Sequence, residues 1–132
     1  MTIRTLSVIG GAMLAIAAIA LPQPAVHASN GAGVSPSGEA LFRKRTCAAC
    51  HSLQPGQNRV GPSLAGIVGK PVASVAGYRY SAALKDAAGK WDSQKLDAWL
   101  ANPKAVVPGT KMVTRVTSAQ ERAAIIAYLE KN

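Results

Sequence analysis

The hydrophobic and polar positions along the chain separate an apolar leader from a region of helical pattern. Residues 6–21 are apolar and rich in alanine, and Arg4 supplies a positive charge before them. With the small residues Val26 and Ala28 at positions −3 and −1, this pattern is typical of a secretory signal peptide cleaved after Ala28. An apolar stretch of this length falls short of the roughly 20 residues that cross a bilayer. We therefore expect residues 1–28 to be removed and the protein to be exported, without stable insertion in a membrane.

The rest of the chain has the pattern of helices and loops, with no stretch of alternating strand pattern. Residues 29–36 are rich in Gly and Ser and are predicted to be a flexible lead-in. The folded domain is therefore expected to cover residues 37–132. Side chains able to cap a helix predict where four helices begin: Ser37, Ser81, Asp92 and the pair Thr117 and Ser118.

The predicted helices are short, and each has a signal for its end or its buried face. The first is expected to end near Cys47, the second at Gly89, and the third before Pro103. The last would bury Ile125 and Leu129 on its apolar face. The sequence thus predicts an all-α fold.

Between the first two predicted helices, residues 52–80 form a long irregular region rich in glycine and proline. Such loops bury little surface by themselves. The chain also has only one Phe, two Trp and three Tyr with which to build a core. A large, flat, apolar cofactor at the centre would give these loops a surface to pack against, and haem has that shape.

The stretch CAACH, residues 47–51, carries the clearest chemistry in the sequence. Two thiols three residues apart at a helix end point to the same side and can form thioethers with the two vinyl groups of one haem. His51, next in sequence, would then lie under the iron. This order of residues is the attachment signature of c-type haem, and the predicted export agrees with it.

Three other uses of these residues fit the sequence less well. A thiol redox centre with this spacing expects a strand followed by a helix in a thioredoxin-like chain. A zinc site needs four ligands, but only Cys47, Cys50 and His51 supply Cys or His after the leader. A disulfide across so short a loop would stabilise little. We therefore expect covalent haem.

The candidate axial ligands are few because the leader removes His27, Met1 and Met13. His51 and Met112 are then the remaining histidine and methionine. Met112 follows the turn-rich residues 108–111, which can aim its side chain inward, and methionine is a common partner to histidine in cytochromes. If Met112 is instead an ordinary core side chain, the sixth position is open or held by lysine or water.

The charge of the chain is strongly positive, with a formal net charge of +9 to which the leader contributes only Arg4. Such a surface attracts acidic partners and makes association sensitive to salt. Nucleic acid is not expected as a partner, since the lysines form no run or stripe and an exported protein seldom meets it.

Nearly the whole chain after the lead-in resembles the small class I cytochromes c of the mitochondrial and bacterial c2 type. The resemblance is carried by CAACH, GPSLAGIVG (61–69), GYRYS (77–81), Trp91, NPKAVVPGTKM (102–112) and ERAAIIAYL (121–129). It implies the cytochrome c fold over residues 37–132, with about four short helices and long loops wrapped around one covalently attached haem c.

The resemblance also implies roles for individual residues. The Pro62 carbonyl would accept a hydrogen bond from the His51 ring, Tyr80 and Trp91 would donate to a haem propionate, and Thr110 would lie beside the haem. Gly38 and Phe42 would pack against Ile125 and Tyr128 where the terminal helices cross. The expected haem-binding residues are Cys47, Cys50, His51, Pro62, Tyr80, Trp91, Thr110 and Met112, with His51 and Met112 on the iron.

The sequence departs from the family pattern at three places. One extra residue stands between Phe42 and Cys47, so a local adjustment is expected there. Trp99 replaces a tyrosine whose hydroxyl usually touches the methionine sulfur. The segment after Met112 is one residue shorter, with Thr114 where an aromatic side chain often covers the haem edge.

The function implied is that of a monohaem periplasmic electron carrier, monomeric when free and not an enzyme. We expect an acidic-faced redox protein, such as an oxidase, a quinol–cytochrome c reductase or a periplasmic dehydrogenase, to dock near Arg45, Lys104 and Lys111. Two alternatives remain open: a dedicated haem subunit of a periplasmic dehydrogenase, and a haem peroxidase or gas-binding protein if Met112 leaves the iron easily.

Overall fold

The computed structural model describes residues 36–132, and the predicted signal peptide and most of the lead-in lie outside them. Six helices occur in the described residues: α1 (Gly38–Lys44), α2 (Cys47–Cys50), α3 (Ala82–Lys85), α4 (Ser93–Ala101), α5 (Pro103–Val106) and α6 (Ala119–Leu129). Across residues 36–132 the only β pairing is an isolated bridge between Pro71 and Lys90. The all-α prediction is confirmed. None of the helices in this range is long and apolar enough to cross a membrane.

Polar side chains begin four of the helices as the sequence predicted. Ser37 accepts a hydrogen bond from the backbone N–H of Ala40, and Ser81 does the same for Leu84. Asp92 caps α4, and Ser118, not Thr117, caps α6. Each cap satisfies an N–H group that has no partner within the helix.

The chain between α1 and the CAACH stretch departs from the single helix that the sequence predicted. Helix α1 ends at Lys44, and a separate turn of helix, α2, begins at Cys47. Thr46 between them has φ of 61°, in the left-handed region that a residue with a branched Cβ rarely adopts. A sharp turn at Thr46 therefore separates α2 from α1 in the stretch where the sequence has its extra residue.

The other differences lie in α3 and α5. Helix α3 ends at Lys85, before the expected end at Gly89. The sequence did not predict α5, which starts with Pro103 in its first turn, where the missing N–H of proline costs nothing.

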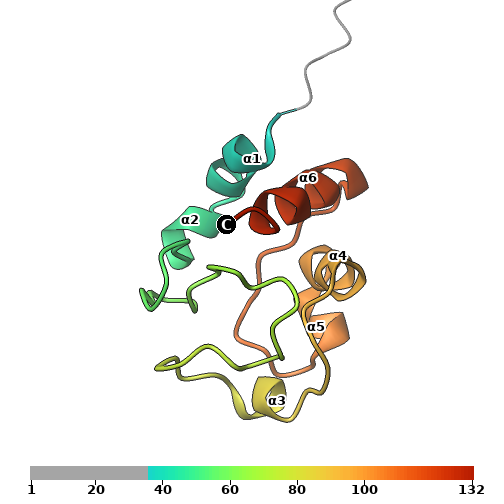
Figure 1. The fold of residues 1–132 in the computed structure, drawn as a ribbon. Coiled ribbons are helices and arrows are strands. Elements are labelled where there is room, and N and C mark those ends of the chain that lie inside the picture. Colours follow the sequence, from blue (N-terminus) through green and yellow to red (C-terminus); the bar gives the residue numbers. More distant parts are fainter. Residues whose placement is uncertain (1–35) are drawn as a thin grey trace, which may run out of the picture. The chain divides into compact units, whose positions relative to one another are not determined.

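Helices α1 and α6 cross at close range, side by side in Figure 1. The Phe42 and Tyr128 rings lie 5.8 Å apart between their centroids, and Leu41 and Ile125 are each only 1% exposed. Gly38 makes the close approach possible, because a Cβ atom there would lie 2.1 Å from the Ala124 carbonyl oxygen. The expected packing of Gly38 and Phe42 against α6 is present.

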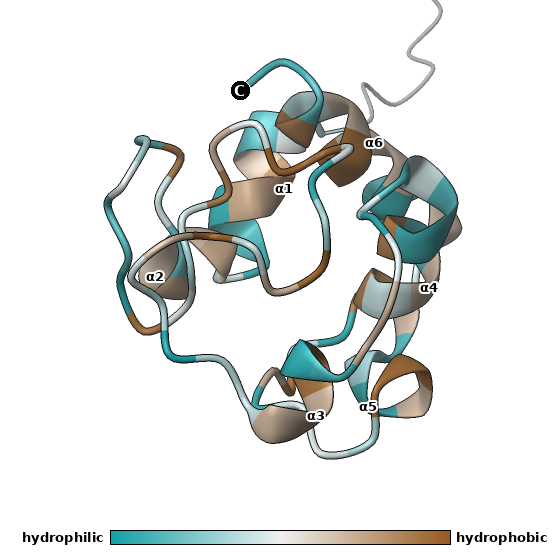
Figure 2. Ribbon diagram, turned by 60° about the horizontal axis from the view of Figure 1, so that its bottom comes forward, coloured by the Kyte–Doolittle hydropathy of each residue, from teal (hydrophilic) through white to brown (hydrophobic). Residues whose placement is uncertain are grey.

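The remaining elements form a ring, with the irregular residues 52–80 running from α2 to α3 (Figure 2). Glycine and polar residues alternate with short apolar stretches along this loop (Figure 2). Trp91 and Trp99 meet edge to face, 5.0 Å between centroids, where the loop region joins α4. The buried side chains thus come from α1, α3, α4, α6 and the loops together.

The crossing of α1 and α6 makes a prediction about Gly38. The substitution Gly38→Val should lower the free energy of unfolding by about 2 kcal/mol or more, because overpacking forces apart two helices that touch through backbone. Urea unfolding of the purified protein measures this. The exposed neighbour substitution Glu39→Ala is the control, and an equal midpoint for the two variants would contradict the account.

Candidate functional site

A cavity of about 390 Å³ lies at the centre of the described residues, lined mostly by apolar side chains. Its walls come from α2, α4, the loops around residues 60–64 and 78–81, and the chain around residues 110–114. Each of the eight residues that the sequence assigned to haem lines it: Cys47, Cys50, His51, Pro62, Tyr80, Trp91, Thr110 and Met112. Residues far apart in the sequence are thus brought to one site.

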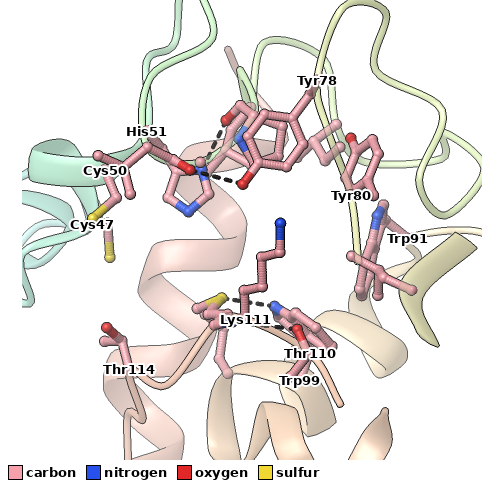
Figure 3. A pocket seen from close by; sticks show the side chains of 18 of the residues that line it. Cys47, Cys50, His51, Tyr78, Tyr80, Trp91, Trp99, Thr110, Lys111 and Thr114 are labelled. Atoms are coloured by element: carbon pink, nitrogen blue, oxygen red, sulfur yellow. Dashed lines mark hydrogen bonds between the residues drawn. The ribbon is translucent and has the colours of Figure 1, made fainter. Parts of the chain in front are cut away.

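Helix α2 places both thiols and His51 on one wall of the cavity (Figure 3). The His51 N–H donates to the Cys47 carbonyl, 2.9 Å away, which closes the turn. Cys47 and Cys50 are not joined in a disulfide. Burial raises the pKa of Cys47, with a smaller contribution from Cys50, so at neutral pH its sulfur is protonated. The wall therefore presents two thiols and an imidazole in a fixed arrangement.

The His51 ring is oriented by the loop beside it. Its Nδ1 lies 2.8 Å from the Pro62 carbonyl oxygen. Burial lowers the pKa of His51, so the imidazole is neutral at pH 7. Because a carbonyl only accepts, Nδ1 carries the hydrogen and Nε2 keeps its lone pair. The ring is thus prepared to bind a metal through Nε2.

Gly61 allows the loop to come this close to the ring. A Cβ atom at Gly61 would lie 2.3 Å from Cε1 of His51. The Gly61 N–H donates to the Cys50 carbonyl, 2.8 Å away, which ties the loop to the end of α2. A side chain at this position would displace either the ring or the loop.

Trp99 stands across the cavity from His51 (Figure 3), and its indole holds Met112. Trp99 Nε1 donates to the Met112 sulfur at 3.1 Å. The Met112 N–H donates to Thr110 Oγ1, 3.3 Å away, and Thr110 is itself buried. The tryptophan that departs from the family pattern therefore still donates a hydrogen bond to the methionine sulfur.

Tyr80 and Trp91 stand on a third side of the cavity, next to each other in Figure 3. Burial raises the pKa of Tyr80, so its hydroxyl stays protonated and can donate. The same oxygen accepts from the Val75 N–H at 3.3 Å. The Tyr80 hydroxyl and the Trp91 indole N–H would face a ligand that is otherwise surrounded by apolar side chains.

The sequence analysis missed Tyr78, which also lines the cavity. Its hydroxyl donates to the Val60 carbonyl at 2.7 Å, and its ring meets Tyr80 edge to face, with 4.7 Å between centroids. The signal was the pair of tyrosines two residues apart in GYRYS, which can point to one side of an extended loop. Tyr78 joins the two halves of the long loop over the site.

The three basic residues expected at a docking surface lie in different surroundings. Lys111 lines the cavity, and its amine donates to the Arg79 carbonyl at 3.4 Å. Lys104 is exposed on α5. Arg45 forms an ion pair with Glu121 of α6, and both side chains are partly buried. Arg45 is thus engaged within the fold and its charge is balanced.

The residues that surround the cavity fit a haem group. The thiols and Nε2 of His51 stand on one wall, a thioether lies across from them, and the lining between is apolar. Two hydrogen-bond donors on a third side suit the carboxylates at one edge of the macrocycle. Sulfur and imidazole ligands of this kind are those of cytochrome haem iron.

Comparison with known proteins agrees with this chemistry. The family model for cytochrome c matches residues 35–132. The chain is 43% identical over 103 residues to a cytochrome c of Nigella damascena, covering 76% of this chain and 92% of that protein. It is 47% identical over 98 residues to the cytochrome c-type cyt cy of Rhodobacter capsulatus, covering 74% of this chain but only 48% of that longer relative.

A solved structure has the same fold. Cytochrome cH from Methylobacterium extorquens superposes with a TM-score of 0.66 at 42% identity, covering 72% of this chain and 95% of that one. The family match spans all the helices and the whole cavity. The chain therefore belongs to the cytochrome c family, as a class I c-type cytochrome that carries covalently attached haem c.

Proposed function

We propose that this protein is an exported one-electron carrier whose haem iron is ligated by His51 and Met112. The observation that carries the proposal is that Nε2 of His51 and the sulfur of Met112 belong to opposite walls of one apolar cavity, each side chain held by its own hydrogen bond. When bound, the haem supplies a ferric/ferrous couple that exchanges one electron.

The protein's part in this reaction is to keep the site nearly unchanged between the two oxidation states. The Pro62 carbonyl fixes the His51 ring and raises its basicity. The Trp99 indole restricts the Met112 side chain. Two fixed ligands leave little to rearrange when the iron gains or loses an electron. An apolar lining favours the ferrous form, which has the lower charge.

The other predicted site residues complete the proposal. Cys47 and Cys50 would form the thioether bonds, with the thiol hydrogens adding to the vinyl carbons. Tyr80 and Trp91 would donate to a propionate, and Thr110 would support the Met112 backbone through its hydroxyl. We also propose that residues 1–28 are the signal peptide, that residues 37–132 form the domain, and that the protein works in the periplasm.

A basic, partly apolar surface at the cavity opening supports docking of an acidic redox partner. Val60 and Val113, both among the cavity-lining residues, are 77% and 67% exposed. Lys111 lies beside them in the lining, and Arg79 is tied to it. Exposed apolar side chains next to positive charge suit a short-lived complex that forms fast and separates fast. Arg45, paired with Glu121, contributes less than the sequence suggested.

The sixth position of the iron gives the first test. Carbon monoxide should leave the visible spectrum of the reduced wild-type protein unchanged, because Met112 occupies the site. The variant Met112→Ala should bind the gas and shift its spectrum. Lys104→Gln, a change on α5 outside the cavity lining, is the control. A wild-type protein that binds the gas as readily as Met112→Ala would contradict the proposal and favour a gas-binding or peroxidase function.

The second test concerns the support of His51. Gly61→Ala should reduce the yield of haem-containing protein and lower its free energy of unfolding by about 1–3 kcal/mol, since the new methyl group displaces the ring or the loop. Absorbance of the purified protein and urea unfolding measure both effects. Gln57→Ala changes an exposed residue of the same loop outside the cavity lining and should leave both unchanged. Normal yield and stability for Gly61→Ala would show that the close approach is not needed.

The third test concerns docking. Lys111→Glu should slow bimolecular electron transfer to an acidic partner at low salt several-fold, and the difference should shrink as salt is raised. Lys131→Glu makes the same change in net charge at the C-terminal end, away from the cavity lining. Stopped-flow kinetics with both variants measures the rates. Equal slowing by both variants would mean that only net charge matters.

A further inference from the structure

The chain that follows Met112 is held along α4. We call residues 113–117 the post-methionine segment. The Val116 N–H donates to the Leu100 carbonyl at 2.8 Å, and Arg115 Nε donates to the Ala101 carbonyl at 3.2 Å. Just before the segment, the Met112 sulfur accepts from Trp99 of the same helix. Helix α4 therefore supports both Met112 and the irregular chain after it.

Arg122 of α6 contacts both α4 and the end of the post-methionine segment. Arg122 of α6 forms two hydrogen bonds with the Asp97 carboxylate of α4, at 2.7 and 3.3 Å. Its Nη1 also donates to the carbonyls of Val116 and Thr117, at 3.1 and 2.8 Å. A single side chain thus joins α4, α6 and the end of the post-methionine segment.

The segment has few other attachments. Val113 is 67% exposed and adds little burial, whereas Val116 is almost completely buried. No helix or strand is present in this part of the described chain, between α5 and α6. The Arg122 side chain is only 12% exposed, and three of its four hydrogen bonds are partly buried, whereas the bond to Thr117 is exposed. Arg122 and Val116 together therefore fix where the segment lies.

We propose that Arg122 is a positioning residue that keeps Met112 in the cavity and so keeps the sixth position of the iron closed. The inference rests on the proposed ligation by Met112. Local opening of the post-methionine segment would give a minor open state in which Met112 has left the cavity, beside the closed state with Met112 inside. Contacts made only when the segment lies on α4 stabilise the closed state, and the Arg122 contacts with Val116 and Thr117 are of this type.

The sequence did not indicate this role for Arg122, which appears there only as a basic residue in the stretch ERAAIIAYL. Arg and Lys are not equivalent here, because the planar guanidinium reaches a carboxylate and two carbonyls at once. Lysine at this position can keep the attraction to Asp97 but not all four hydrogen bonds. The substitution Arg122→Lys should therefore lie between the wild type and Arg122→Gln.

The experiment compares Arg122→Gln with Arg45→Gln in the haem-containing protein. Both substitutions remove an arginine that pairs with a carboxylate and joins helices, but Arg45 does not touch the post-methionine segment. Three quantities are measured: the binding rate of carbon monoxide in the reduced protein, the far-red band of methionine-ligated ferric haem, and amide hydrogen exchange of Val116 and its neighbours, which is a readout independent of the haem.

We expect Arg122→Gln to speed gas binding and Val116 exchange roughly five- to tenfold, since losing hydrogen bonds to a charged group shifts a local equilibrium by this order. The far-red band should weaken, because Met112 would leave the iron more often. Arg45→Gln should reduce stability without changing gas binding. If Arg122→Gln does not fold, Asp97→Asn and Arg122→Lys keep part of the network and should show smaller shifts in the same direction.

The outcomes separate this inference from the function on which it rests. A wild-type protein that already binds carbon monoxide as Met112→Ala does would mean that Met112 is not the ligand, which contradicts the proposed function. A closed wild type with equal gas binding and equal Val116 exchange in Arg122→Gln and Arg45→Gln would overturn only the role of Arg122.

Discussion

The hydrogen bond between His51 Nδ1 and the Pro62 carbonyl, 2.8 Å long, organises the site on which the rest of the structure depends. It fixes the ring tautomer and orientation, so that Nε2 is the nitrogen left for a metal. It also joins α2 to the long loop, and Gly61 makes the contact possible because it has no side chain. A shift of this loop would move the imidazole with respect to the two thiols of α2.

Helix α4 supports the wall of the cavity that carries Met112. Trp99 donates to the Met112 sulfur, and the carbonyls near the end of the helix hold the chain that follows. The two proposed ligands thus belong to separate structural units, one built on α2 and its loop and the other on α4, α6 and the post-methionine segment. As long as both units are rigid, the site rearranges little when the oxidation state changes. Greater mobility of the unit built on α4, α6 and the post-methionine segment would open the iron to small molecules.

The helix starts and the cofactor could be predicted from the sequence because each depends on residues close together in the chain. Ser37, Ser81, Asp92 and Ser118 begin helices as their side-chain chemistry indicates, and the CAACH stretch identified the cofactor. The sequence did not predict the left-handed turn at Thr46, the separate helix α5, or the partners of Arg45 and Arg122. Those ion pairs join residues far apart along the chain, and no spacing rule indicates which carboxylate meets which arginine. Tyr78 was missed for a related reason, since its role depends on the distant Val60 carbonyl.

The central claim is that imidazole and thioether together hold the iron of a carrier that changes little when it takes up an electron. X-ray absorption at the iron edge tests it most directly, because it detects sulfur atoms bound to the metal. The account predicts one sulfur neighbour in both the oxidised and the reduced protein, with nearly equal iron–ligand distances. An iron without a sulfur neighbour, or one that loses it on a change of oxidation state, would contradict the account.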